Sequence, residues 1–224
     1  ADGHATIFDW LQGKYVDETT RGYYKTLKRF PSLVYVALGV KRTFDDVPVL
    51  TSSLHFELAE PLTIAESSVG TLGVRVFNND RSHAPAGRTT LLCAFGSDYE
   101  WWKQMCQDAS CYCRLKNGIA DRVVTALDGR FPGLASRVEM RDVATPLTIV
   151  RYTGNWQGSF EGWMVTPETW MIRMPRTLPG LKRFWMCGQW VEPGGGIPPA
   201  ALSGRDAVQF LCAEDKKRFT TCLP

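Results

Sequence analysis

The stretch FWMCGQWVEPGGGIPPAALSGRDA, residues Phe184–Ala207, predicts a short buried strand, a glycine-rich loop and a helix in succession. Gly188 opens the loop and Gly194–Gly196 close it. The two prolines that follow suit a first helical turn, so we expect the helix from about Ala200 to Cys212. Free amides and the positive end of a helix dipole suit an anionic or electron-rich ligand. A plain flexible turn fits the three glycines as well, so the loop alone leaves both interpretations open.

The same stretch resembles the C-terminal flavin motif of phytoene desaturase and carotenoid isomerase relatives. Two more stretches are similar to this family, ADGHATIFD at residues 1–9 and RYTGNWQGSFEGW at residues 151–163. The resemblance implies FAD as cofactor and a division of the chain into three parts. Residues 1–13 would leave an FAD-binding domain, residues 14–176 would form a substrate-binding domain, and residues 177–224 would return to the FAD-binding domain.

The resemblance also implies which residues contact FAD. Gly188 and Gln189 would meet its ribityl and pyrophosphate part, and the three later glycines with Ile197 would run along the isoalloxazine. Many relatives in the wider flavoprotein group carry an acidic residue where Gln189 stands, so a carboxylate role is not expected here. The helix dipole at Ala200 would favour negative charge on the N1 and C2 carbonyl region of the ring. The implied cofactor-binding residues are Gly188, Gln189, Glu192, Gly194, Gly195, Gly196, Ile197 and Ala200.

One part of the family pattern is missing from the sequence. Dinucleotide recognition in this family begins with G-x-G-x-x-G between a strand and a helix, in the N-terminal Rossmann half. No such motif occurs here. We therefore expect either a truncated product of a longer protein or a chain that pairs with a separate polypeptide carrying that half. Alone, it is expected to hold FAD poorly.

The remaining sequence predicts an α+β fold with a mixed, largely antiparallel sheet backed by helices. The segment LVYVALGV is rich in β-branched and aromatic residues and lies between Pro31 and two cations. Ser97 and Glu100 have the spacing of a capping box, which predicts a helix from there to about Arg130. The expected strands are residues 33–40, 54–58, 72–77, 89–95 and 137–144, and further helical pieces are expected at 6–12 and 17–30.

Aromatic residues are dense around the third resembling stretch. Tyr152, Trp156 and Trp163 are the candidate substrate-binding residues, because the family's long polyene substrates need an apolar cavity. A core built from large side chains explains the same residues, since eight tryptophans must be buried somewhere. Glu161 and Glu192 are acid or base candidates, with surface or loop carboxylates as the alternative. No catalytic residue can be assigned.

Charge and cysteine content exclude some classes of protein. The chain has 26 basic and 23 acidic residues spread along its length, so no basic stripe predicts nucleic-acid binding. Its seven cysteines are an odd number, which favours a reduced, cytoplasmic setting. Their spacing lacks the paired knuckles of structural zinc, so no metal is expected, although Cys93, Cys106, Cys111 and Cys113 leave a thiol-rich metal site as an alternative. No apolar run approaches a membrane span, so any membrane contact is expected to be peripheral.

Together these patterns predict part of an FAD-dependent oxidoreductase that desaturates or isomerises an apolar, polyene or isoprenoid-like substrate, with hydride transfer to flavin N5. The alternative is a non-catalytic lipid-binding or partner-binding module derived from the same family.

Overall fold

The computed structural model describes residues 2–48 and 53–221, which form two compact units. Unit 1 comprises Ala1–Pro31 and Val150–Pro224, and unit 2 comprises Ser32–Ile149. The functional division expected from the sequence has its boundaries at residues 13/14 and 176/177, which do not coincide with the boundaries of these compact units. That division stays a prediction. Cys222 lies outside the described residues.

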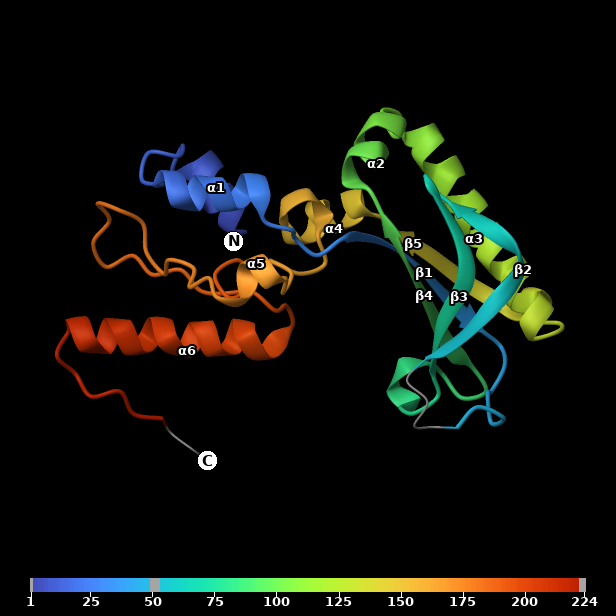
Figure 1. Cartoon of the computed structure of the whole chain (residues 1–224). Helices are drawn as coiled ribbons and strands as arrows, with labels where there is room; N and C mark the ends of the chain where they lie inside the picture. Colours follow the sequence, from blue (N-terminus) through green and yellow to red (C-terminus); the bar gives the residue numbers. More distant parts are fainter. Residues whose placement is uncertain (1, 49–52, 222–224) are drawn as a thin grey trace. The chain divides into compact units, whose positions relative to one another are not determined.

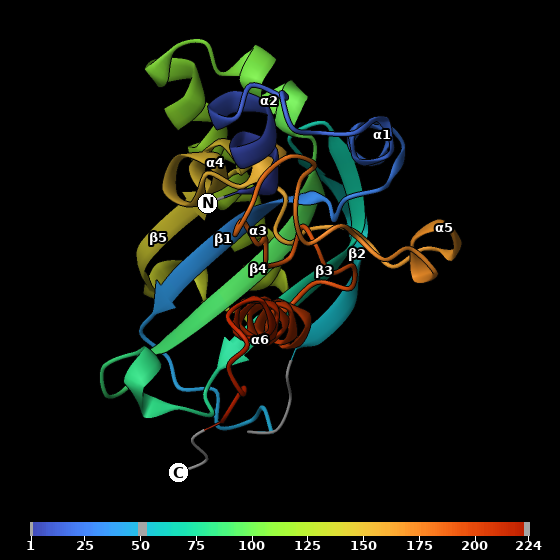
Figure 2. The ribbon, with the colours of Figure 1, turned by 90° about the vertical axis from the view of Figure 1, so that its left-hand side faces the viewer.

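Unit 2 contains a five-stranded antiparallel sheet with the strand order β2-β3-β4-β1-β5 (Figures 1 and 2). The predicted α+β class and antiparallel pairing are confirmed, and the five strands expected between residues 33 and 144 are all present. The strands are β1 (Ser32–Val40), β2 (Leu54–Ile64), β3 (Ser67–Phe77), β4 (Thr89–Ser97) and β5 (Val138–Ala144).

The core of unit 2 lies between the sheet and one long helix, α3 (Ala109–Arg130), which runs along one face of the sheet (Figure 1). Alternate residues of β1 are buried from Val34 to Val40, as expected for a strand with one covered face. The facing side of α3 buries Ile119, Val123 and Leu127. Each buried aliphatic side chain stabilises the fold by about 1.5–3 kcal/mol relative to exposure. The predicted apolar face of this helix is therefore confirmed.

The predicted single helix from Ser97 was wrong in its start and its continuity. Asp98 caps α2 (Tyr99–Met105), because its carboxylate accepts a hydrogen bond from Trp101 N at 2.8 Å. The Ser97 hydroxyl instead accepts from the Trp102 indole at 2.8 Å. The chain then leaves the helix, and α3 begins anew where Asp108 accepts from Cys111 N at 2.7 Å. Two aspartate caps thus begin two separate helices in place of the single predicted one.

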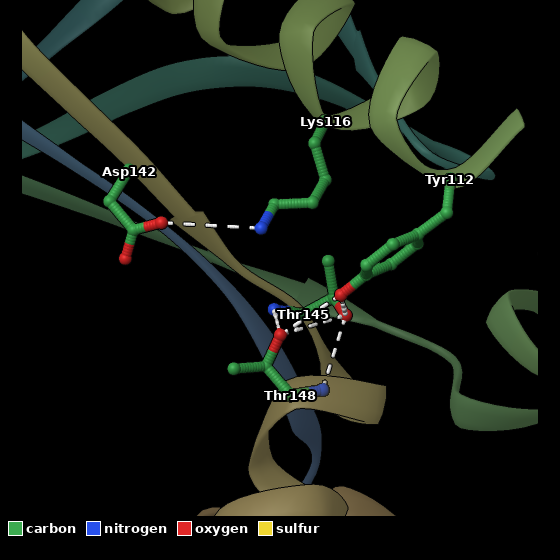
Figure 3. A network of polar contacts seen from close by, with 5 residues as sticks. All are labelled: Tyr112, Lys116, Asp142, Thr145 and Thr148. Atoms are coloured by element: carbon green, nitrogen blue, oxygen red, sulfur yellow. Dashed lines mark hydrogen bonds and ion pairs between the residues drawn. The ribbon is translucent and has the colours of Figure 1, made fainter. Parts of the chain in front are cut away.

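A partly buried polar network ties α3 to the start of α4 (Pro146–Thr153) (Figure 3). The Tyr112 hydroxyl lies 2.8 Å from the Thr145 hydroxyl and 3.0 Å from the Thr148 hydroxyl. Thr145 N donates to the Thr148 hydroxyl at 3.1 Å, which satisfies an amide at the helix start. Lys116 reaches Asp142 of β5 at 4.0 Å beside this network. The first turn of α4 is thus held by unit 2.

Unit 1 has little regular sheet. Residues 28–31 run beside residues 160–164, with Phe30 N donating to Gly162 O at 2.9 Å and Met164 N to Lys28 O at 2.9 Å. The predicted strand at 184–187 is wrong: the segment is half-buried coil, because one backbone bond from Met186 N does not make a ladder. The helices of unit 1 are α1 (Glu18–Thr26), α5 (Pro167–Trp170) and α6 (Ile197–Glu214), with a π-helical turn η1 (Ala5–Trp10) and a 3₁₀ turn η4 (Trp156–Gly158). Further 3₁₀ turns in unit 2 are η2 (Arg81–His83) and η3 (Ala135–Arg137).

Candidate functional site

The glycine loop (residues 188–196) is held at both ends. Gly188 N donates to the Ser203 hydroxyl on α6 at 2.7 Å, and Gly194 N donates to Trp163 O at 3.1 Å. Ser203 is fully buried, so the first contact is shielded from water. All four glycines of the loop have positive φ, from 66° at Gly195 to 129° at Gly194. Side chains rarely tolerate such angles, so glycine is required by the backbone as well as by any ligand.

The two ends of the loop differ in what they face. A β-carbon placed on Gly188 would meet no atom within 4 Å. A β-carbon on Gly195 would collide with the Glu161 carboxylate and lie 2.7 Å from the Phe30 ring. The space over Gly188 is therefore open, whereas the corresponding side of Gly195 faces the chain's own interior. The contact of Gly195 with the isoalloxazine stays a prediction.

The N-terminus of α6 follows the loop directly. The helix starts at Ile197, three residues before the predicted start at Ala200, with Gly196 as N-cap and no side-chain cap. By helix geometry the Ala200 amide is the first that can donate within the helix. The two prolines have no N–H, so the amides at this terminus that can serve a ligand are those of Gly196 and Ile197.

The side chain of Gln189 is turned toward unit 1 itself. The Asn155 carbonyl accepts hydrogen bonds from the Gln189 amide at 2.9 Å and from the Trp190 indole at 2.8 Å. The Asn155 amide in turn donates to Ser159 O at 2.5 Å. Gln189 thus positions the start of the loop through its side-chain donor. A β-carbon on Gly162 would also collide with the backbone carbonyl of Gln189, so this glycine allows the close approach.

An ion-pair cluster ties the middle of the loop to α6. Arg176 forms salt bridges with Glu192 in the loop and, at 3.4 Å, with Asp206 on the helix. Because its charge is balanced by Arg176, Glu192 suits a positioning role better than proton transfer. Arg176 Nη1 and the Trp185 indole nitrogen are buried and have no hydrogen-bond partner within the described chain. Buried donors of this kind commonly meet a ligand or an ordered water.

The aromatic residues near the loop form a packed cluster. Trp163 is 1% exposed and contacts Tyr24 and Trp190 edge to face, each with ring centroids 5.0 Å apart. Trp156 stacks on His4 at 4.9 Å and lies 6.1 Å from Trp163. Burial, with the nearby Asp2 charge, raises the pKa of Tyr24, so its hydroxyl stays neutral.

The structure therefore brings two of the three predicted substrate residues together and separates the third. Trp156 and Trp163 share the aromatic cluster, whereas Tyr152 on α4 is 76% exposed. The burial of Trp163 favours the core interpretation for that residue. Asn155, Gly162, Ser203 and Arg176 support the loop but were not predicted. Asn155 and Gly162 lie in the RYTGNWQGSFEGW stretch, and the resemblance of that stretch to the family is the sequence signal that could have identified them.

Residues 18–212 match the family model described as flavin containing amine oxidoreductase. The chain belongs to this family. It is 28% identical over 194 residues to prolycopene isomerase of Daucus carota, a chloroplastic protein, covering 86% of the chain and 31% of the relative. It is 26% identical over 206 residues to the chloroplastic prolycopene isomerase of Arabidopsis thaliana, covering 91% and 34%. The chain thus spans about a third of the length of these relatives.

An oxidoreductase of known structure from Methanosarcina mazei aligns with 92% of the chain and 41% of its own length, at 14% identity and a TM-score of 0.47.

Family membership implies a flavin cofactor, and the residues of unit 1 fit one. The open side of Gly188 admits close approach, and α6 has an uncapped N-terminus directly after the loop. Arg176 and Trp185 add buried donors without partners in the same unit. These features suit the polar and phosphate-bearing part of a flavin nucleotide.

Within residues 2–48 and 53–221, no three His, Cys, Asp or Glu side chains are grouped to hold a metal ion. Over the same part of the chain, no helix combines the length and apolar character that crossing a bilayer requires.

Proposed function

We propose that this chain is part of an FAD-dependent oxidoreductase that desaturates or isomerises an apolar, polyene or isoprenoid-like substrate. The family match and the prolycopene isomerase relatives support it. Bound FAD would supply a hydride acceptor at its N5 position. The single structural observation that carries the proposal is the glycine loop, open over Gly188 and leading straight into the uncapped N-terminus of α6.

Within this proposal, the chain's own residues bind and position the cofactor. The amides of Gly196 and Ile197 donate toward negative charge at the positive end of the α6 dipole. Arg176 holds the loop against α6 through Glu192 and Asp206, so the loop keeps its shape relative to the helix. Tryptophans packed behind the loop exclude water from its inner side.

A dinucleotide-binding half, on the same polypeptide or a separate one, would complete the site. The outer face of α6 supports this partner, because Ile197 and Val208 lie on the same side of the helix and are 83% and 48% exposed. Ala201 lies between them and is also exposed. Exposed apolar side chains aligned on one helix face mark a surface that another element covers.

A second candidate is a non-catalytic lipid-binding module, and one observation favours it. Unit 2 has an apolar groove of about 620 Å³ between β2 and α3, within the usual size of small-ligand sites. Phe56, Leu58 and Leu62 line its strand side, and Ala126 lies on its helix side. None of the predicted site residues lines this groove.

The test co-expresses the chain with a dinucleotide-binding half and compares flavin content in matched variants. Gly188→Ala places a methyl group in the open space over the loop at φ 107°. Gly133→Ala is the control, because Gly133 also has positive φ, at 81°, and open space but lies in unit 2. We expect at least about a tenfold loss of flavin affinity in the first variant, or about 1.4 kcal/mol, and none in the control.

Equal flavin content in both variants would remove the cofactor role of the loop. Binding of an apolar ligand by a preparation that takes up no flavin would favour the lipid-binding module. Bleaching of the flavin absorbance by a polyene under anaerobic conditions would identify the redox substrate class.

A further inference from the structure

Two cysteines lie on either side of the corner between α2 and α3 in unit 2. Cys106 is the C-cap of α2, and Cys111 lies in the first turn of α3. The Cys111 thiol donates a hydrogen bond to Met105 O at 3.3 Å. Across a trans peptide that oxygen lies about 2.8 Å from the next Cα, so Cys111 Sγ is within about 6 Å of Cys106 Cα. This bound places the Cys111 sulfur beside Cys106, and rotation of the two side chains has to bring the sulfurs to the bonding distance of about 2 Å.

The two thiols differ in environment. Cys106 packs partly against the core of unit 2, and burial, followed by the charges of Cys111 and Asp108, raises its pKa. It therefore remains protonated more readily than an exposed thiol and reacts less readily with peroxide, which assigns the first oxidation to Cys111. Cys113, two residues further along α3, is exposed, and Cys93 is buried in the core, where burial raises its pKa to about 12.

We propose that Cys106 and Cys111 are a peroxide-responsive dithiol pair. Hydrogen peroxide oxidises the Cys111 sulfur to a sulfenic acid, and one water leaves. The Cys106 sulfur then attacks that sulfur, the S–S bond forms, and the hydroxyl departs with the Cys106 proton as a second water. The two thiols lose two electrons and two protons to one peroxide, and an external dithiol reverses the reaction. The bond ties α2, which carries the buried Trp102, to the start of α3.

The test treats the whole chain with hydrogen peroxide, blocks remaining thiols by alkylation and digests without reduction. Cleavage before Asp108 separates residues 98–107 from residues 108–120, so these peptides stay joined only through a disulfide. Further cleavage after Tyr112 separates Cys111 from Cys113. We expect the linked pair to weigh about 2 Da less than the sum of the two free peptides, and to contain Cys106 and Cys111.

Matched variants identify which cysteines form the link. Cys113→Ser should retain the link, whereas Cys106→Ser and Cys111→Ser should each lose it, and Cys93 should stay unmodified in all three. Separate peptides after peroxide treatment of the parent chain would overturn the proposal. A link that runs to Cys113, survives Cys111→Ser and disappears in Cys113→Ser would overturn it equally.

Discussion

Replacing Trp163 by alanine should destabilise unit 1 by about 3–5 kcal/mol, the usual cost of truncating a buried aromatic side chain. The side chain is 1% exposed, and its indole donates to Trp190 O at 3.1 Å. That hydrogen bond accounts for about 1 kcal/mol of the loss. The edge-to-face contacts with Tyr24 and Trp190 contribute about 0.5–1.5 kcal/mol each, and the cavity accounts for the rest.

Two variants separate the parts of this effect. Trp163→Phe keeps a ring but removes the indole donor, so we expect a loss of about 1–2 kcal/mol. Trp170→Ala is the matched control, because Trp170 is 74% exposed and should change stability by less than about 0.5 kcal/mol. The assay is chemical denaturation with hydrogen exchange read on unit 1 amides, where a constant denaturant slope identifies a true change in stability.

The outcome also distinguishes a core tryptophan from a substrate wall. A loss below about 1 kcal/mol for Trp163→Ala, with weakened polyene binding, would refute the packing argument. Trp163 would then line an apolar substrate cavity, as the sequence analysis predicts for it.

Tyr112→Phe should lower the free energy of unfolding by about 1–2 kcal/mol, because the Tyr112 hydroxyl bridges two threonines at the start of α4. Thermal unfolding measures this loss, and an unchanged midpoint would contradict it. Arg176→Leu should lower the free energy of unfolding by about 1–3 kcal/mol, since Glu192 and Asp206 lose their shared partner. Both carboxylates are partly exposed, which limits the loss, and stability in urea equal to that of the parent would speak against the prediction. Hydrogen bonds from Cys111 N and the Ser110 side chain hold the pKa of Asp108 below its ordinary value. The Asp108 cap therefore stabilises α3 above about pH 4, and this stabilisation is lost as the pH falls through the lowered pKa. Exchange protection at the start of α3 should fall with pH in the parent but not in Asp108→Asn, which keeps a capping side chain.

Most of the unit 2 architecture follows from local patterns. The segment LVYVALGV became β1, with alternate residues from Val34 to Val40 buried, because a strand covered on one face needs apolar side chains at every second position. The four-residue spacing of Ile119, Val123 and Leu127 likewise became the inner face of α3. The capping box at Ser97 failed because Asp98, the next residue, accepts from Trp101 N and caps the helix, while the Ser97 hydroxyl accepts from the Trp102 indole.

The candidate site was only partly predictable. The run of glycines before two prolines identified the loop and the helix, since both residue types restrict the backbone through their own covalent structure. Neither pattern indicates that Gly195 faces Glu161 while Gly188 faces open space. That difference depends on which side of the loop the rest of unit 1 occupies.

The sequence by itself determined the class of fold, the glycine loop and the resemblance to a flavoprotein family, because these depend on residue types within short stretches. The tertiary structure decided which side chains support that loop. Asn155 reaches Gln189 across 34 positions, and Asp2 accepts from Trp156 N across 154 positions. Hydrogen bonds and ion pairs act over about 3 Å in space and carry no periodic signal along the chain, so only the folded backbone brings their partners together.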